Sequence, residues 1–375
     1  MQIAKFTYVS TGGEDWTFSA VEFQPFNLLV GDSATGKTRL LNTLFNIGRF
    51  VASDEYKSGH WIFELMHDSV RYEWELATDG QDEEDPRIVK EVLTKYEEGE
   101  PRSLIRRSRD SFFFDNSRLP RLQPRVSALS LLREENEIRP IYNGFSTIQR
   151  RRFFDTDLAD ISKLEPPPRD LMKRDRNITM EDIYYKAQVN LNARLYLLAR
   201  HFPTEFANLR DAFRDAFPFV SEAEVRDITD IAPHLTFPVE IPVFCIREQG
   251  SDQWLPVVEL SSGMQKILLI LTDLYIMPSG AIYIIDEYEN SLGVSAINFF
   301  PEFILNLEKQ VQVFVTSHHP YLINNVPPDN WYLFNRTGRK ITIRYGKELL
   351  DRLGKSRQQA FIKLINDPVY RHAIE

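Results

Sequence analysis

The apolar positions of the chain follow two periods, one typical of strands and one typical of helices. Short strands are predicted at the start, and they end with the compact run Phe26–Val30 between Pro25 and Gly31, which suits a buried strand. The next apolar residues recur at helical spacing and predict a helix with one buried face: Leu40, Leu41, Leu44 and Phe45. The chain therefore presents a strand, a glycine-containing loop and a helix in that order.

Two segments further along alternate between apolar and polar residues, as half-buried strands do. They are Trp61–Leu65 and Val70–Leu76, and their proximity in the chain predicts an antiparallel hairpin. Ile88–Tyr96 and Arg102–Phe114 are candidates to extend this sheet, although their pattern does not separate strand from helix.

The middle of the chain turns helical from about Val126. Pro166–Pro168 interrupt this region and mark a surface linker. Thr179 and Asp182 have the spacing of a capping box, which opens a long helical stretch over Ile183–Phe202, and a further helix is predicted over Thr204–Phe217. Strand character returns after Ala232 in three segments: Phe237–Phe244, Ala281–Ile285 and Val311–Thr316.

Composition limits the class of protein. The 375 residues are 43% hydrophobic and 26% charged, which excludes a disordered or fibrous chain and leaves room for one large core or two modest ones. A single cysteine, Cys245, cannot form an internal disulfide, and neither a signal peptide nor a membrane-spanning run is recognisable. We therefore expect a cytoplasmic protein that does not enter a membrane.

The formal net charge of −9 conceals an uneven distribution. Residues 101–176 contain 17 Lys and Arg against 11 Asp and Glu, and most of the basic residues are Arg, which binds phosphate in a bidentate manner. Two interpretations remain open for this segment. It contacts a nucleic acid, or its arginines pair with nearby acids on a solvated surface.

The loop after the first buried strand has the pattern of a phosphate-binding loop. Residues 31–38 match G-x-x-x-x-G-K-[ST] between a predicted strand and a predicted helix. Successive backbone N–H groups of such a loop face a polyphosphate, Lys37 supplies a point charge, and the Thr38 hydroxyl can ligate Mg²⁺. The predicted nucleotide-binding residues are Gly31, Asp32, Ser33, Ala34, Thr35, Gly36, Lys37 and Thr38.

A second segment supplies acids for a metal and for catalysis. The apolar run from Ala281 ends in Asp286 and Glu287, whose side chains would point in opposite directions on a strand and so cannot have the same role. We assign Asp286 to Mg²⁺, together with Thr38, and Glu287 to orienting or deprotonating the attacking water.

Two further segments are candidates for the same site. Ser261 is a good N-cap for the helix that should follow it, and the small residues Ser262 and Gly263 would let an anion approach the backbone. The strand from Val311 runs into a turn with two histidines, His318 and His319.

In chain order these four segments resemble the nucleotide-binding fold of ABC-type ATPases, with Walker A at 31–38, a signature at 260–264, Walker B at 281–287 and the switch histidine at 318. The runs ELSSGMQK, IIDEYENSLG and TSHHPYLIN are similar to the soluble "AAA" ATPases of the overcoming-lysogenization-defect, Septu and RecF/SMC groups, many of which act in phage defence or DNA repair. The resemblance implies an α/β fold, a P-loop head with a mixed sheet, an antiparallel β-subdomain and an inserted helical subdomain. The corresponding division is 1–126 and 233–345 for the two halves of the head, 127–232 for the helical insertion and 346–375 for a helical tail.

The resemblance also implies that two heads enclose two nucleotides. Ser261 and Gly263 would contact the γ-phosphate bound by the partner copy. His318 would sense the γ-phosphate bound by its own copy. All three residues would therefore belong to an ATP site. Closure of the dimer would exclude water from that phosphate. ATP and Mg²⁺ are the expected cofactors, and a homodimer or higher oligomer is the expected assembly.

Several positions depart from the family pattern. Relatives usually have Asn and Gly where this loop has Ser33 and Ala34, and Gly and Gln where the signature has Ser262 and Met264. Gln123 and Gln149 are candidates for the glutamine that such ATPases carry between the β-subdomain and the helical insertion.

The leading hypothesis is an ATPase whose ATP-driven head dimerisation regulates an effector or a nucleic-acid interaction in anti-phage defence. Too few residues follow the histidine turn for the Toprim nuclease domain of overcoming-lysogenization-defect proteins, so a nuclease or toxin is expected as a separate polypeptide. The alternatives are an ATP-locked scaffold with little hydrolysis, and a RecF-like repair clamp that binds DNA through Arg106, Arg107 and Arg109.

Overall fold

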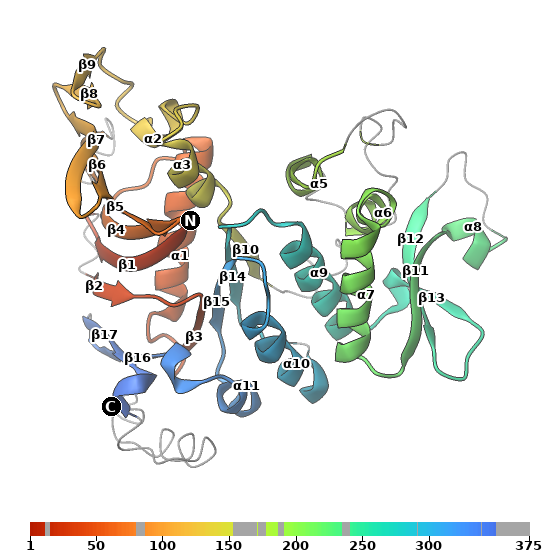
Figure 1. The fold of residues 1–375 in the computed structure, drawn as a ribbon. Helices are drawn as coiled ribbons and strands as arrows, with labels where there is room; N and C mark the ends of the chain where they lie inside the picture. The colour runs from red at the N-terminus through yellow and green to blue at the C-terminus, as the bar shows by residue number, and fades with distance from the viewer. Residues whose placement is uncertain are drawn as a thin grey trace. The chain divides into compact units, whose positions relative to one another are not determined.

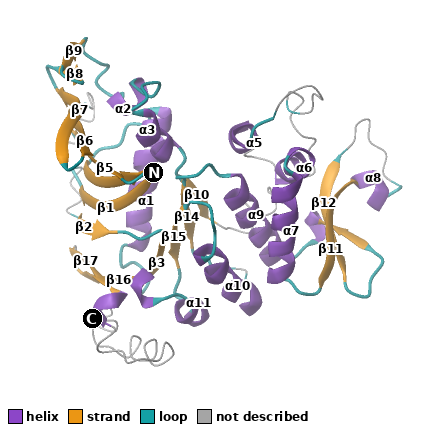
Figure 2. Ribbon diagram, in the orientation of Figure 1, coloured by secondary structure: helices purple, strands orange, loops and turns teal. Residues whose placement is uncertain are grey.

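The computed structural model divides the chain into two compact units, each with helices and strands (Figures 1 and 2). The residues that it describes are 1–11, 16–79, 87–152, 171, 178–186, 191–234, 241–290, 292–338 and 340–349. The first unit comprises Met1–Arg151, Ser279–Glu287 and Glu308–Glu375, and the second comprises Arg152–Pro278 and Tyr288–Leu307. The linker predicted at 166–168 and most of the tail predicted at 346–375 lie outside the described residues.

An antiparallel sheet of eight strands forms one part of the first unit, in the order β2-β1-β4-β5-β6-β7-β8-β9. Its strands are β1 (Gln2–Val9), β2 (Thr17–Glu22), β4 (His60–His67), β5 (Val70–Thr78), β6 (Ile88–Glu97), β7 (Glu100–Ser108), β8 (Phe112–Phe114) and β9 (Ser117–Leu119). The predicted hairpin is confirmed as β4 and β5, in which Phe63 faces Trp74. The segments whose pattern was ambiguous are strands β6, β7 and β8.

A mixed sheet of six strands forms the other part, in the order β10-β14-β15-β3-β16-β17. Its strands are β3 (Phe26–Val30), β10 (Gln149–Arg152), β14 (Ile282–Asp286), β15 (Gln312–Thr316), β16 (Trp331–Thr337) and β17 (Lys340–Tyr345). Strands β14, β15, β3 and β16 are parallel, and β17 is antiparallel to β16. Every residue of β3, β14 and β15 is buried, as expected for central parallel strands.

Helices α1 (Lys37–Ser53), α2 (Ala128–Leu131), α3 (Arg139–Ser146) and α11 (Pro320–Asn325) complete the first unit. Helix α1 contacts β14, β15 and α3, and it buries the face that carries Leu40, Leu41 and Leu44, as predicted. Gln312 of β15 joins the two sheets, because its side chain donates to the carbonyls of Ile3 and Gln24 and accepts from the N–H of Ile3. The two sheets therefore share one hydrophobic core.

The second unit packs helices against a small antiparallel sheet. The sheet has β11 (Val220–Asp227), β12 (Pro242–Glu248) and β13 (Trp254–Pro256), and the helices are α5 (Met180–Lys186), α6 (Leu191–His201), α7 (Pro203–Ala216), α8 (Ile228–Ile231), α9 (Ser262–Ile276) and α10 (Val294–Leu305). Helix α9 contacts α5, α6 and α7. Arg194 of α6 and Asp273 of α9 form an ion pair with both side chains at or below 1% exposure.

The second unit contains predicted elements and one strand that was not predicted. The capping box is confirmed, since Thr179 and Asp182 exchange hydrogen bonds at 3.1 Å. The helical stretch over 183–202 is described as α5 and α6, with 187–190 outside the described residues. Strand β11 was not predicted, because its buried residues Val220 and Ala223 do not alternate.

Burial raises the pKa of the Cys245 thiol of β12 to about 12, so the thiol stays protonated at neutral pH.

A buried carboxylate connects the large sheet to α2. Glu91 of β6 is fully buried, and it accepts hydrogen bonds from the Ser127 hydroxyl at 2.6 Å and the Ala128 N–H at 2.8 Å, both at the N-terminus of α2. Arg107 of β7, whose side chain is 5% exposed, forms an ion pair with Glu91 at 3.4 Å. Removing one member of such a pair leaves the other charge buried without compensation.

We therefore expect Glu91→Ala to lower the free energy of unfolding by about 3–5 kcal/mol. Glu97→Ala is the matched control on the same strand, because Glu97 is half exposed and forms surface ion pairs whose loss costs about 1 kcal/mol or less. Urea unfolding followed by circular dichroism measures both changes. An equal loss in the two variants would contradict this assignment.

Candidate functional site

The carboxyl ends of three neighbouring parallel strands bring the predicted chemical groups of the first unit to one edge. Leu29 of β3 pairs with Thr316 of β15, and Val315 pairs with Ile285 of β14. The N–H of Ser317 also donates to the Leu29 carbonyl at 3.3 Å. In open α/β sheets, ligands bind at the carboxyl ends of the strands. The loop after β3, the acids at the end of β14 and the histidines after β15 therefore lie at the same edge of the sheet.

The loop between β3 and α1 requires both of its glycines. Gly31 and Gly36 have φ angles of 150° and 107°. A Cβ on Gly31 would lie 2.6 Å from the Phe334 carbonyl oxygen, and one on Gly36 would lie 2.5 Å from the side chain of Ile341. Ala34 also has a positive φ, at 64°, which favours glycine, the residue that relatives usually have there. Left-handed residues of this kind are typical of backbone nests, whose successive N–H groups bind anions.

Polar side chains fix the loop and the start of α1. The Lys37 ammonium donates to the carbonyls of Gly31 and Asp32 at 2.6 and 2.7 Å, and the buried Thr35 hydroxyl donates to the Asp32 carbonyl at 2.8 Å. Ser33, Ala34 and Thr38 are exposed. Gly36 is the N-cap of α1 and has no side chain that could accept a hydrogen bond there. The first turn of α1 contains no acidic residue. An uncapped helix start of this kind favours negative charge near its N-terminus.

Asp286 at the end of β14 is held from both sides. The Thr316 hydroxyl donates to its Oδ1 at 2.7 Å, and the Arg150 guanidinium donates to its Oδ2 at 2.5 Å. Arg150 also donates to the side chain of Asn42 on α1. The side chains of Asp286 and Arg150 are 9% and 5% exposed, so their ion pair is largely shielded from water.

Glu287 differs from Asp286 in exposure and in conformation. The strand ends at Asp286, and Glu287 has a left-handed φ of 55°, so the residue is not part of the regular strand. Its N–H donates to the Thr316 hydroxyl at 2.7 Å, and its side chain is exposed. The two carboxylates therefore have different surroundings because of this turn, and not because of strand alternation. A non-glycine residue in this conformation is uncommon and is typical of functional sites.

The two histidines after β15 are distinguishable in the structure. The His319 ring accepts a hydrogen bond from the Tyr321 N–H at 3.3 Å and caps α11, so its role is structural. His318 is exposed and lies two residues beyond the end of β15, at the edge that also carries Gly31 and Asp286. His318 is therefore the more exposed histidine of the pair.

The signature residues belong to the second unit. Ser261 caps α9, accepting from the Met264 N–H at 3.3 Å, and Ser261 and Ser262 are exposed while Gly263 is buried. Lys266 of α9 is fully buried and donates to the carbonyls of Tyr288 and Asn290 at 2.6 and 2.9 Å. The helix that starts at the signature is thus bonded to the segment that follows Glu287.

Three site residues were not identified from the sequence: Arg150, Thr316 and Asn42. Arg150 follows Gln149, one of the two glutamines considered for the link to the helical insertion. Gln149 lies on β10, beside β14, whereas the carbonyl of Gln123 accepts from Arg107 in a turn. Of the two candidates, Gln149 is the one that lies beside a strand of the site. The run of arginines that follows Gln149 was the sequence signal that could have indicated Arg150.

Most of the described arginines in the basic segment, residues 101–176, form ion pairs with acidic side chains. Ion pairs with Asp or Glu involve seven of them: Arg102, Arg107, Arg109, Arg121, Arg133, Arg139 and Arg150. Arg107 is buried, so it cannot contact DNA as the repair-clamp alternative requires. The ion-pair interpretation therefore holds for these seven described arginines.

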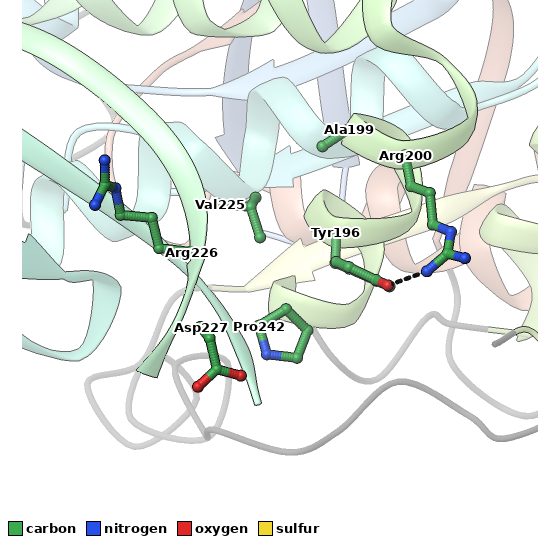
Figure 3. A pocket seen from close by; sticks show the side chains of 7 residues that line it. All are labelled: Tyr196, Ala199, Arg200, Val225, Arg226, Asp227 and Pro242. Carbon is green, nitrogen blue, oxygen red and sulfur yellow. Dashed lines mark hydrogen bonds between the residues drawn. The ribbon is translucent and has the colours of Figure 1, made fainter. Parts of the chain in front are cut away.

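A small cavity of about 240 Å³ lies within the second unit (Figure 3). Its lining residues are Tyr196, Ala199, Arg200, Val225, Arg226, Asp227 and Pro242. Arg200 donates to the Tyr196 hydroxyl, Arg226 turns toward the ring of Trp254, and Asp227 accepts from the N–H groups of Thr229 and Ile241. The polar groups of this cavity are engaged within the fold, and none of the motif residues lines it.

Comparison with solved structures identifies the fold. A crystal structure of an SmcHead bound to the C-winged helix domain of ScpA is similar with a TM-score of 0.54 and 13% sequence identity, covering 93% of this chain and 100% of that chain. An Smc head domain with an extended coiled coil, bound to the C-terminal domain of ScpA from Pyrococcus furiosus, has a TM-score of 0.52 and 12% identity, covering 94% and 98%. The chain therefore has the fold of an SMC head.

The family follows from the sequence. The chain belongs to the family described as "AAA domain, putative AbiEii toxin, Type IV TA system", whose model matches residues 26–324. No curated protein matches the chain. Within the described ranges, no helix is long and apolar enough to span a membrane, and no group of three or more His, Cys, Asp or Glu side chains is arranged to hold a metal by itself.

The buried hydroxyl of Thr316 should matter more to stability than the exposed hydroxyl of Thr38. Thr316→Val removes the donor to Asp286 and the acceptor of the Glu287 N–H, so we expect the free energy of unfolding to fall by about 2 kcal/mol. The same change at Thr38 is expected to alter it by about 0.5 kcal/mol or less. Chemical denaturation of both variants without nucleotide checks the difference, and the reverse order would exclude the described role of Thr316.

Proposed function

We propose that this chain is a Mg²⁺-dependent ATPase that binds ATP at the carboxyl edge of its parallel strands. One observation carries the proposal: the phosphate-loop sequence, the Asp286–Glu287 pair and His318 follow three strands that are adjacent and in register. Membership of an AAA-domain family and the SMC-head fold support the same assignment.

The residues at this edge fit a magnesium–triphosphate group. The loop turns at two positions where a Cβ would clash, and the first turn of α1 offers N–H groups that no side chain caps. Thr38 and Asp286 would hold Mg²⁺, which in nucleotide sites takes one or two protein ligands and completes its shell with phosphates and water. When bound, the ion neutralises charge on the phosphates.

The remaining roles follow from exposure and charge. Lys37 would transfer its ammonium from the loop carbonyls to the β- and γ-phosphates, which are stronger acceptors because their oxygens carry negative charge. Glu287, exposed beside the buried Asp286, would orient or deprotonate the attacking water, and His318 would contact the γ-phosphate. Glu287 is the residue that favours an active ATPase over an ATP-locked scaffold.

A second copy of the chain would complete the site. Ser261 and Gly263 start α9, and its N-terminus offers N–H groups to a phosphate held by the partner copy. Closure would exclude water from the γ-phosphate and strengthen each electrostatic contact there. ATP would therefore control the association of two heads, and hydrolysis would reverse it.

Head association is proposed to regulate a separate effector, a nuclease or toxin, in anti-phage defence. The family description, which names a putative AbiEii toxin and a type IV toxin–antitoxin system, is consistent with a defence setting. An effector protein is preferred to a nucleic acid as the regulated partner, because seven described arginines of the basic segment pair with acids.

Glu287→Gln should separate ATP binding from hydrolysis. We expect it to reduce ATP turnover by about 100-fold or more while ATP binding persists, because a glutamine cannot accept the water proton. The variant should then accumulate as a dimer with Mg²⁺–ATP in analytical ultracentrifugation, whereas Lys37→Ala should neither bind ATP nor dimerise.

Glu302→Gln is the matched control, since Glu302 is an exposed acid on α10 and its loss should leave turnover unchanged. Equal and negligible turnover in the wild type and in Glu287→Gln, with tight ATP binding in both, would instead identify an ATP-locked scaffold.

A further inference from the structure

The Arg150–Asp286 ion pair lies where the proposed site would require a different cation. Oδ2 of Asp286 is 2.5 Å from the Arg150 guanidinium, and Oδ1 is bonded to the Thr316 hydroxyl. Asp286 is also the carboxylate proposed to hold Mg²⁺. A guanidinium ion and a hydrated divalent cation repel each other, and burial of the pair reduces the screening by water.

The second partner of Arg150 places it beside the other proposed metal ligand. Asn42, whose side chain accepts a hydrogen bond from Arg150, follows Thr38 by four residues on α1. Residues four apart lie on the same face of a helix, one turn from each other. Arg150 therefore joins the two elements, α1 and β14, that carry the residues proposed for Mg²⁺.

We propose that Arg150 is an internal cation that neutralises Asp286 in the nucleotide-free protein and is displaced from it when Mg²⁺ arrives with the nucleotide. This inference rests on the proposed function and assigns a regulatory residue to the same site. The guanidinium keeps the buried carboxylate compensated until the metal replaces it. The chain passes from the first unit to the second directly after Arg151, so the exchange acts on the strand that leads into the second unit.

The Arg150→Gln change should affect triphosphate binding in opposite directions with and without metal. In Arg150→Gln, Asp286 has no counter-charge, so a metal-free triphosphate is repelled and its Kd in EDTA should rise. With Mg²⁺ no guanidinium competes for Asp286, so the Kd should fall or stay equal. The ratio of the Kd in EDTA to the Kd in Mg²⁺ should therefore grow about tenfold or more relative to the wild type.

The measurement is a fluorescence titration with a slowly hydrolysed, fluorescently labelled ATP analogue, which requires no turnover. Arg152→Gln is the matched control on the same strand, because this exposed arginine carries the same charge, and its ratio should stay within about twofold of the wild type. Asn42→Ala loosens the guanidinium without removing it and should give an intermediate ratio, so the test survives if Arg150→Gln does not fold.

An unchanged ratio in Arg150→Gln and Asn42→Ala would overturn the inference. So would an equal loss of affinity in EDTA and in Mg²⁺, which would mean that Arg150 contacts the phosphates directly. Lys37→Ala distinguishes this failure from failure of the proposed function. If Lys37→Ala does not weaken binding of the analogue, the nucleotide site itself is wrong, whereas a Lys37-dependent site with an unchanged ratio removes the Arg150 inference alone.

Discussion

The register of three parallel strands is the constraint on which the site depends. Hydrogen bonds between β3, β15 and β14 fix the positions at which each strand ends, and every residue of these strands is buried. A shift of one residue would turn each buried side chain to the other face. The phosphate loop, the paired acids and His318 are therefore positioned by the core, although they lie far apart in the sequence.

Thr316 links the strand register to the chemistry. Its hydroxyl bonds Asp286 and receives the N–H of Glu287, so a residue of β15 fixes both acids that follow β14. The left-handed turn at Glu287 then separates a buried carboxylate, suited to hold a cation, from an exposed one, suited to act on water. One hydroxyl thus fixes the carboxylate of Asp286 and the backbone of Glu287.

The sequence was sufficient where local pattern determines structure. The strand–loop–helix around Gly31, the hairpin of β4 and β5 and the capping box at Thr179 were predicted because their signals lie within a few residues. Partners distant in the chain could not be predicted, since Arg150 meets Asp286 across 136 positions and nothing local indicates the pairing. Strand β11 was missed because helices cover part of it and its burial does not alternate.

We infer that Lys37 and its glycine loop bind a triphosphate at this strand edge, and the roles of the other site residues depend on that contact. A crystal structure with Mg²⁺ and a slowly hydrolysed ATP analogue tests it most directly. We expect the Lys37 ammonium to leave the carbonyls of Gly31 and Asp32 and to contact the β- and γ-phosphates, with Thr38 and Asp286 facing the metal. A structure in which the lysine stays on those carbonyls while the analogue binds elsewhere would exclude this site.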